Sequence, residues 1–345
     1  MPKLKNRNMD FYQSLEEKWG DYLRTGEKDK KDIIKAIPTG SFSLDAALGI
    51  GGIPMRRFTE ISGAEGSGKT TLALTMAGNA IRMGYNVLYV DPEQAVDLSR
   101  ASILAKMDVK DTDKFVLLQP SIMEEALGIC EDGIKSKKFG LIIVDSLAAL
   151  APQKVLDDDL DDANIALLAR IMPIFLQRNL FTIRYYDVAF VGLNQIRDKI
   201  GMYVKMYDTP GGHAWKHATS VRIQLSKLSD IEQGSEKIGI TTKFVIKKSK
   251  VSPPFRASTF PVMFDTGIDR TRNVVEFAES LGVLLKNGAH YKFNDITLGK
   301  GMSAAIAYLD SNDDMRLDIE KACYSVVNTG SVLYSGEEDS NETLT

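Results

Sequence analysis

At residues 63–70 the chain reads Gly63-Ala64-Glu65-Gly66-Ser67-Gly68-Lys69-Thr70, which matches the P-loop pattern GxxxxGK[ST]. A β-rich run (58–62) precedes this motif, and a helical pattern (70–83) follows it. Glycines let a backbone wrap a phosphate with its N–H groups, and the start of a helix adds partial positive charge. The motif and its flanks therefore predict a nucleotide site that takes ATP and Mg²⁺.

The residue types in and near the motif suggest separate tasks. Lys69 is expected to reach the β- and γ-phosphates, and Thr70 to hold Mg²⁺ through its hydroxyl. Asp145 closes the apolar run 141–144 and fits the carboxylate that binds the magnesium shell, although an Asp at a strand end can also be a helix cap. The predicted phosphate- and metal-binding residues are Gly63, Glu65, Gly66, Ser67, Gly68, Lys69, Thr70, Thr71 and Asp145.

A third carboxylate, Glu93, stands just past the predicted strand 87–91. A group at the carboxyl end of a parallel strand faces the ligand crevice. Glu93 could there orient and deprotonate an attacking water, or it could be a plain surface-loop residue. The residues alone leave both interpretations open.

Outward from the motif, short β-rich runs alternate with helical patterns. Strands are predicted at 58–62, 87–91, 141–145 and 188–193, with helices over 70–83 and from Ser121. This alternation predicts βαβ units and a largely parallel sheet. From Ser220 on, the β runs 221–225, 243–247 and 260–265 have no long helices between them, which predicts antiparallel strands at the sheet edge. The expected fold class is an α/β P-loop ATPase core, a mostly parallel sheet flanked by helices.

We predict four parts along the chain. Residues 1–33 form an N-terminal helix and linker, with Phe11, Leu15, Trp19 and Leu23 on one stripe that docks on its own core or on a neighbouring subunit. Residues 34–268 form the ATPase core. Residues 269–333 form a small α+β C-terminal domain with a helix over 274–285. Residues 334–345 form an acidic tail that we expect to be disordered.

Composition limits the functional classes. The formal net charge of −3 excludes a uniformly basic nucleic-acid binder, so any such site is a local patch. Cys130 and Cys323 stand in apolar surroundings and are predicted to be buried, reduced thiols. No run of about 18 apolar residues and no secretory signal occurs, so we expect a soluble, cytoplasmic protein with no membrane partner.

Several segments together resemble the RecA family of recombinases. They are the approach to the P-loop (39–49 and 51–54), the segment Asp91-Pro92-Glu93-Gln94-Ala95-Val96-Asp97, the motif Asn194-Gln195-Ile196-Arg197, and the stretch 247–250 followed by Pro253-Pro254-Phe255. The resemblance covers about residues 35 to 330, and its motifs are highly specific in combination. It implies a RecA-type core with a short N-terminal helix and a small C-terminal domain.

The resemblance also implies roles for single residues. Glu93 matches the general base, and Gln195 matches the sensor that reads the γ-phosphate and passes its presence to the adjoining DNA-binding loop. Lys248 and Lys250 match a lysine pair that is donated across a filament interface to the neighbour's ATP. With Lys69, these are the predicted catalytic residues. Asp97 and Arg100 fall at the nucleotide, and Arg100 replaces an aromatic that commonly stacks on adenine; a guanidinium can stack too.

For DNA, the segment 197–212 carries cations that suit phosphates and aromatic or thioether side chains that suit stacking on bases. The alternative is a lid over the nucleotide. Arg170 matches a basic DNA contact of the family, whereas the acidic stretch 157–162 would repel phosphate. The predicted DNA-binding residues are Arg170, Arg197, Lys199, Met202, Tyr203, Lys205, Gly211 and Gly212.

The implied function is ATP-dependent homologous pairing and strand exchange by a helical filament of this chain on single-stranded DNA, with homologous duplex DNA as the second partner. Single-strand-binding protein and loading mediators are further possible partners, in a bacterial or phage-infected cell. A helicase or other DNA motor on the same core is an alternative, although about 33 N-terminal residues cannot supply the extra domain that such helicases usually carry. An ATP-gated recombination scaffold is another; it would predict a defective Glu93 or Lys69, and both are present.

Overall fold

A computed structural model of the chain describes residues 11, 13–18, 34–109, 113–152, 164–198, 207–208 and 211–329. The chain forms two compact units, Met1–Lys35 and Ala36–Thr345. In the first unit, Phe11 and residues 13–18 are helical, where the sequence predicts a helix. Trp19 and Leu23 of the predicted stripe, and the acidic tail, lie outside the described residues.

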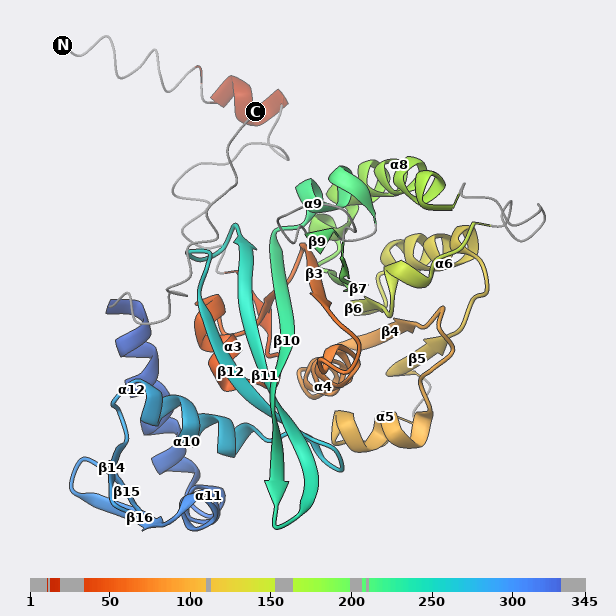
Figure 1. The fold of residues 1–345 in the computed structure, drawn as a ribbon. Coiled ribbons are helices and arrows are strands. Elements are labelled where there is room, and N and C mark those ends of the chain that lie inside the picture. The colour runs from red at the N-terminus through yellow and green to blue at the C-terminus, as the bar shows by residue number, and fades with distance from the viewer. Residues whose placement is uncertain are drawn as a thin grey trace, which may run out of the picture. The chain divides into compact units, whose positions relative to one another are not determined.

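The second unit is built on a nine-stranded sheet in the order β13-β12-β11-β10-β3-β7-β6-β4-β5 (Figure 1). The pairs from β10 to β5 are parallel, and those from β10 to β13 are antiparallel, which confirms the predicted change of pattern. The strands are β3 (Phe58–Gly63), β4 (Asn86–Val90), β5 (Phe115–Leu118), β6 (Phe139–Val144), β7 (Ala189–Gln195), β10 (Val221–Gln233), β11 (Glu236–Ser249), β12 (Ala257–Met263) and β13 (Gly267–Ile268).

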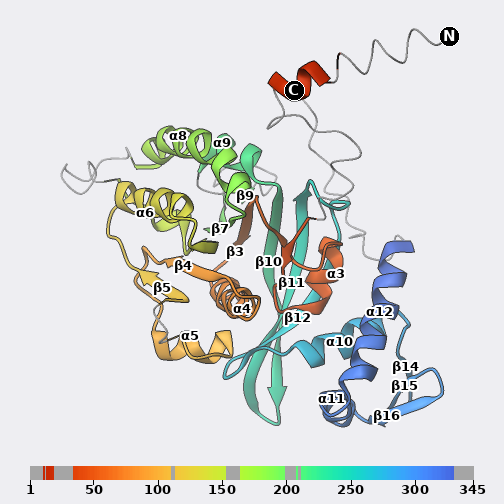
Figure 2. The ribbon, with the colours of Figure 1, turned by 180° about the vertical axis from the view of Figure 1, so that it is seen from behind.

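Both faces of the parallel strands are buried, as their continuous apolar runs require. Ile143 on β6 packs into the cluster that includes α4 (Lys69–Arg82) and α5 (Leu98–Ala105), whereas its neighbour Ile142 packs with α6 (Met123–Lys135), α8 (Asn164–Tyr185) and α9 (Gly212–Ala218). Figures 1 and 2 show α4 and α5 below β4 to β6, and α6 and α8 above them. Cys130 and Cys323 are buried and free, as predicted.

The C-terminal part follows the antiparallel edge of the sheet. It contains α10 (Arg270–Ser280), β14 (Leu285–Asn287), β15 (His290–Phe293), β16 (Ile296–Lys300), α11 (Met302–Asp310) and α12 (Asp313–Thr329). The predicted helix 274–285 is wrong at both ends. It begins at Arg270 because the Asp269 side chain caps it by accepting from Arg272 N, and it ends at Ser280, just before Gly282 turns the chain with a φ of 71°.

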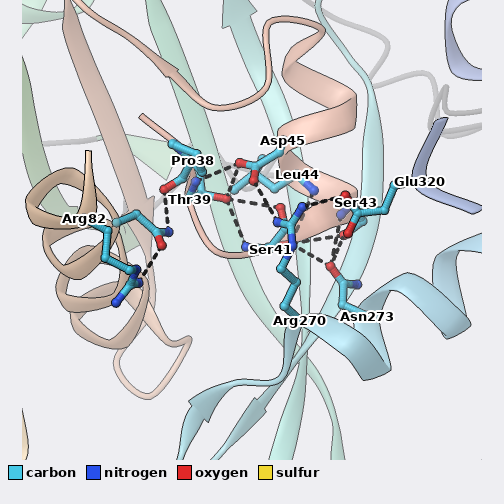
Figure 3. Close-up of polar contacts among 11 residues, drawn as sticks. Pro38, Thr39, Ser41, Ser43, Leu44, Asp45, Arg82, Arg270, Asn273 and Glu320 are labelled. Carbon is cyan, nitrogen blue, oxygen red and sulfur yellow. Dashed lines mark hydrogen bonds and ion pairs between the residues drawn. The ribbon is translucent and has the colours of Figure 1, made fainter. Parts of the chain in front are cut away.

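A buried ion-pair network joins this part to the approach to the P-loop (Figure 3). Asp45 on α3 (Phe42–Leu48) accepts from Thr39 N at 2.8 Å and Thr39 Oγ1 at 2.7 Å. Arg270 pairs with Asp45 at 3.4 Å and with Glu320 of α12 at 3.0 Å. Phe42 packs edge-on against Phe277, with ring centroids 5.7 Å apart. The network therefore connects segments more than 200 positions apart in the chain.

The remaining short elements are β1 (Ala36–Ile37), β2 (Ile53–Pro54), the 3₁₀ turn η1 (Leu147–Ala149), β8 (Arg197–Asp198) and β9 (Tyr207–Asp208). Within the described part of the chain, no helix has the length and apolar character needed to cross a membrane.

Candidate nucleotide and DNA site

The P-loop forms the turn between β3 and α4, as its flanks predicted. Gly66 and Gly68 have φ values of 70° and 91°, a region that L side chains rarely adopt, so the turn needs glycine at Gly68 of the pattern and favours it at Gly66, which the pattern leaves open. Ser67 Oγ donates to Ala64 O at 2.7 Å and closes the loop. The first N–H groups of α4 have no helical partner, which makes this turn a phosphate-binding geometry.

The Lys69 side chain folds back over the P-loop. Its Nζ donates to Gly63 O at 3.0 Å and to Ala64 O at 2.9 Å. Burial lowers the pKa of Lys69, and the nearby carboxylates of Asp145, Glu93 and Glu65 act against that shift. The cation therefore stands among the carboxylates that the sequence assigned to the same site.

Asp145 follows β6 directly and is nearly fully buried, and one of its carboxylate oxygens accepts hydrogen bonds from two hydroxyls. Thr70 Oγ1 donates to Asp145 Oδ2 at 2.7 Å, and Tyr89 on β4 donates to the same oxygen at 2.8 Å. Burial raises the pKa of Asp145, and these two hydrogen bonds oppose the shift. A hydroxyl beside a carboxylate offers the hard oxygen ligands that Mg²⁺ prefers, so Thr70 and Asp145 fit the ion.

No group of three or more His, Cys, Asp or Glu suited to a metal occurs among the described residues. Mg²⁺ is commonly held by one or two protein oxygens together with substrate phosphates, so Thr70 and Asp145 suffice for such a site.

Glu93 follows β4 and reaches the same edge of the sheet. Its Oε1 accepts from Ser146 Oγ, and Ser146 comes directly after Asp145 and is 1% exposed. The loop that carries Glu93 is shaped by Asp91, whose Oδ2 accepts from Val96 N at 2.9 Å and from Gln119 Nε2 at 3.0 Å. The structure thus brings the predicted base next to the predicted metal carboxylate.

Asp97 and Arg100 both have local structural contacts. Asp97 caps α5 by accepting from Arg100 N at 2.9 Å. The Arg100 guanidinium donates to Phe264 O and, at 3.3 Å, to Asp265 O in the turn between β12 and β13. These residues therefore connect α5 to the antiparallel edge, a contact that the sequence did not indicate.

Gln195 ends β7 beside the P-loop. The register pairs it with Gly63, and Ile196 N donates to Gly63 O at 3.4 Å. The Gln195 side chain is exposed, while its neighbour Asn194 is buried and donates to Glu60 Oε1 at 2.9 Å. The predicted sensor thus lies where the phosphate-binding turn begins.

The predicted DNA segment leaves the sheet directly after Gln195. β8 and β9 pair antiparallel, with Arg197 opposite Asp208, and form the base of a hairpin. Gly211 and Gly212 have φ values of 100° and 67° and open α9, while Arg170 is exposed on α8. Lys199, Met202, Tyr203 and Lys205, as well as the acidic stretch 157–162, lie outside the described residues.

Lys248 and Lys250 are at the other end of the strands. Lys248 is in register with Arg222 of β10, which pairs with Glu60 near the start of β3. Lys248 Nζ donates to Lys216 O at 2.6 Å, and Lys250 Nζ donates to His217 O at 3.4 Å, both in the last turn of α9. Both ammonium groups therefore point toward α9 and away from the P-loop of their own subunit.

Comparison with known proteins finds two family models that together span most of the chain. The model of the RecA N-terminal domain matches residues 11–269, and the model of the RecA C-terminal domain matches residues 272–327. The chain belongs to the RecA family. Members of this family use ATP with magnesium, bind DNA and form filaments, and the function of this chain is RecA-like homologous recombination.

Individual relatives are also similar to this RecA-family chain over most of its length. Protein RecA of Heliobacterium modesticaldum is 36% identical over 87% of this chain and 86% of that protein, and Protein RecA of Acholeplasma laidlawii is 39% identical over 84% and 86%. Among solved structures, the RadB recombinase is 25% identical, with a TM-score of 0.50, over 67% of this chain and 98% of that chain.

Sequence reasoning missed Tyr89 and Ser146, the hydroxyl donors to Asp145 and Glu93. A signal for Tyr89 existed: it is the one polar-tipped side chain in the apolar run 87–90. For Ser146 only its place beside Asp145 could have drawn attention.

Proposed function

We propose that this RecA-family chain is a DNA-dependent ATPase that assembles as a helical filament on single-stranded DNA and pairs it with a homologous duplex. The observation that carries the proposal is the register of Gly63 with Gln195, two positions before the hairpin base at Arg197. This register joins the phosphate-binding turn to the segment suited to DNA through a short stretch of backbone.

In the proposed nucleotide site, backbone N–H groups of residues 63–71 bind the phosphates, and Lys69 supplies a cation to them. Thr70 and Asp145 hold Mg²⁺, which neutralises phosphate charge when bound. Glu93 orients the attacking water and takes its proton, and Asp97 and Arg100 border the nucleotide beside the β12–β13 turn. Each group comes from the loop or the first helical turn that follows β3, β4 or β6, at the edge where open α/β sheets bind ligands.

The proposed sensor is the exposed amide of Gln195. A γ-phosphate on the P-loop would draw the amide toward it, and β8 would move with the same backbone. The segment 197–212 would then be ordered on DNA, with Arg197, Lys199 and Lys205 on the phosphates and Met202 and Tyr203 against the bases. Gly211 and Gly212 permit the sharp turn into α9, and Arg170 adds a separate phosphate contact.

The position of the lysines favours a head-to-tail assembly. The P-loop is at the carboxyl end of β3, whereas Lys248 and Lys250 reach the α9 end near the start of β10. A subunit cannot close its own site with these lysines, but the next subunit in a repeating head-to-tail contact could do so. Such contacts build helical filaments unless the rotation closes a ring.

The proposal includes the division of the chain into residues 1–33, 34–268, 269–333 and 334–345, with the first part docking between subunits. Single-strand-binding protein and loading mediators are proposed as further partners in the cytoplasm of a bacterial or phage-infected cell.

The test is ATP hydrolysis by the full chain with and without single-stranded DNA, with electron microscopy of the same samples. We expect strong stimulation and helical filaments, followed by strand exchange in the next assay. Stimulation with closed rings would identify a helicase, and no stimulation in either form would identify a scaffold.

A substitution at Gln195 tests the proposed coupling between the nucleotide site and the DNA segment. Gln195→Ala should keep nucleotide binding and lose DNA stimulation, while Gln177→Ala, an exposed glutamine on α8, should retain both. Full DNA-stimulated turnover by Gln195→Ala would show the coupling step to be wrong.

A further inference from the structure

We infer that Tyr89 is a positioning residue for magnesium: its phenol holds the Asp145 carboxylate in the orientation that lets Thr70 and Asp145 receive the ion. The inference rests on the nucleotide site of the proposed function. It assigns a task to a fully buried side chain that the proposed mechanism does not otherwise use.

The sheet register explains how Tyr89 reaches Asp145. Tyr89 of β4 pairs with Ile143 of β6, and both side chains belong to the cluster on the α4 face. Alternation along β6 places Asp145, two residues on, toward this same face. A side chain as long as tyrosine spans such a diagonal between neighbouring strands. The phenol therefore meets the carboxylate where the strand ends.

The hydroxyls of Thr70 and Tyr89 bind the same carboxylate oxygen of Asp145, and this arrangement suits a metal site. Among the described residues, both hydrogen bonds to Asp145 fall on Oδ2, from Thr70 at 2.7 Å and from Tyr89 at 2.8 Å. Because Thr70 donates its proton to Asp145, its oxygen lone pairs remain for Mg²⁺. Oδ1 takes no protein donor there and remains for the water shell of the ion.

The phenol is itself held in place. Tyr89 is fully buried, and its ring packs against Phe115 with centroids 5.9 Å apart. A fixed donor limits the rotation of the carboxylate, so the metal site is organised before the ion arrives. Without the phenol, only the exchangeable contact from Thr70 would orient Asp145.

The test uses Tyr89→Phe, which removes one oxygen and keeps the ring. Binding of a fluorescent ATP analogue to the full chain is titrated with Mg²⁺ and then repeated in EDTA. We expect the Mg²⁺ concentration at half-maximal binding to rise about 10-fold, on the scale of one hydrogen bond to a charged group. Binding in EDTA should be unchanged.

Tyr85→Phe is the matched control, because Tyr85 stands just before β4 at the end away from the site, where it packs against Gly140. Its Mg²⁺ titration should coincide with that of the wild type. If the Mg²⁺ titration of Tyr89→Phe also coincided with that of the wild type, the inference would be overturned and the proposed function would stand. An equal loss of affinity with Mg²⁺ and in EDTA would also overturn it, because the phenol would then shape the pocket only. A wild-type chain that binds no nucleotide would overturn the site itself.

Discussion

At the scale of single residues, the site depends on hydroxyl groups that hold carboxylates. Asp145 accepts from Thr70 and Tyr89, and Glu93 accepts from Ser146. A carboxylate held in one orientation does not have to lose rotamer freedom when substrate binds. The residues that we propose to act on ATP are therefore expected to depend on neighbours that do not touch it.

Ser146→Ala should lower the kcat of DNA-stimulated ATP hydrolysis about 10-fold and leave the KM for ATP unchanged, because a freed Glu93 spends less time oriented toward the water. Steady-state kinetics at saturating DNA measures both constants. Ser146 makes no side-chain capping bond to η1, so the stability of that turn should persist. Ser311→Ala, which removes only local bonds at the end of α11, is the control. A raised KM with unchanged kcat would contradict the role.

At the scale of elements, α9 links the two ends of the subunit. It begins at Gly212, the last residue of the DNA segment, and carbonyls in its last turn accept from Lys248 of β11 and from Lys250 just past that strand. A seven-residue helix is too short to be stable alone, and cations at its carboxyl end stabilise it. In the proposed filament the neighbour's phosphates would compete with these carbonyls for the same ammonium groups.

Lys248→Met should therefore loosen α9 in the nucleotide-free protein. Losing one cation at a helix end lowers local stability enough to speed amide exchange in α9 about three-fold. Hydrogen–deuterium exchange read by mass spectrometry over peptides that cover 211–219 measures this. Lys243→Met, on the same strand, removes a lysine outside the contacts with α9 and should leave the exchange unchanged. Equal exchange in all three proteins would show that α9 does not depend on Lys248.

At the scale of the whole molecule, each nucleotide site is proposed to be completed by the next subunit. Two defective chains should therefore rescue each other. The Lys69→Ala chain has a defective P-loop. The double variant Lys248→Ala, Lys250→Ala has an intact P-loop but cannot supply the lysine pair to the neighbouring subunit. In a random copolymer about a quarter of the interfaces would combine an intact P-loop with an intact lysine pair.

An equal mixture of these two chains should hydrolyse ATP well above the sum of the separate rates, as measured on single-stranded DNA. Mixing either variant with itself at doubled concentration is the control. A rate equal to the sum would show that the lysines do not act across the interface.

The buried network at Asp45 makes the stability of the whole molecule depend on pH. Burial raises the pKa of Asp45 to about 7, against the opposing effects of Arg270 and the hydrogen bonds from Thr39. The folded chain therefore holds a proton that the unfolded chain releases near pH 4. This contribution to stability is full below about pH 4 and is lost as the pH rises toward 7.

Asp45→Asn cannot release that proton. The wild type should lose up to about 2–3 kcal/mol more than the variant in free energy of unfolding between pH 5 and pH 7. Urea unfolding at both pH values measures the difference, and subtracting the variant cancels other buried acids such as Glu276, whose pKa burial also raises. If both proteins lost the same free energy of unfolding between pH 5 and pH 7, the pKa of Asp45 would have its ordinary value.

Sequence alone predicted the parallel core, the antiparallel edge and the P-loop, and it placed Asp145 and Glu93 at the carboxyl ends of neighbouring strands. These follow from short patterns, since apolar periodicity and the strand–loop–helix order are set by residues close together in the chain. The helix predicted at 274–285 was displaced because its limits depend on the Asp269 cap and on the turn at Gly282, which periodicity does not report.

Tertiary structure alone decided which side chains meet. The contacts of Tyr89 with Asp145, of Arg100 with the β12–β13 turn and of Arg270 with Asp45 and Glu320 join segments 50 to 225 positions apart. They depend on strand register and on the packing of helices across the sheet, which no local pattern encodes. For the same reason the lysine pair could be seen in the sequence, but its separation from the P-loop required the fold.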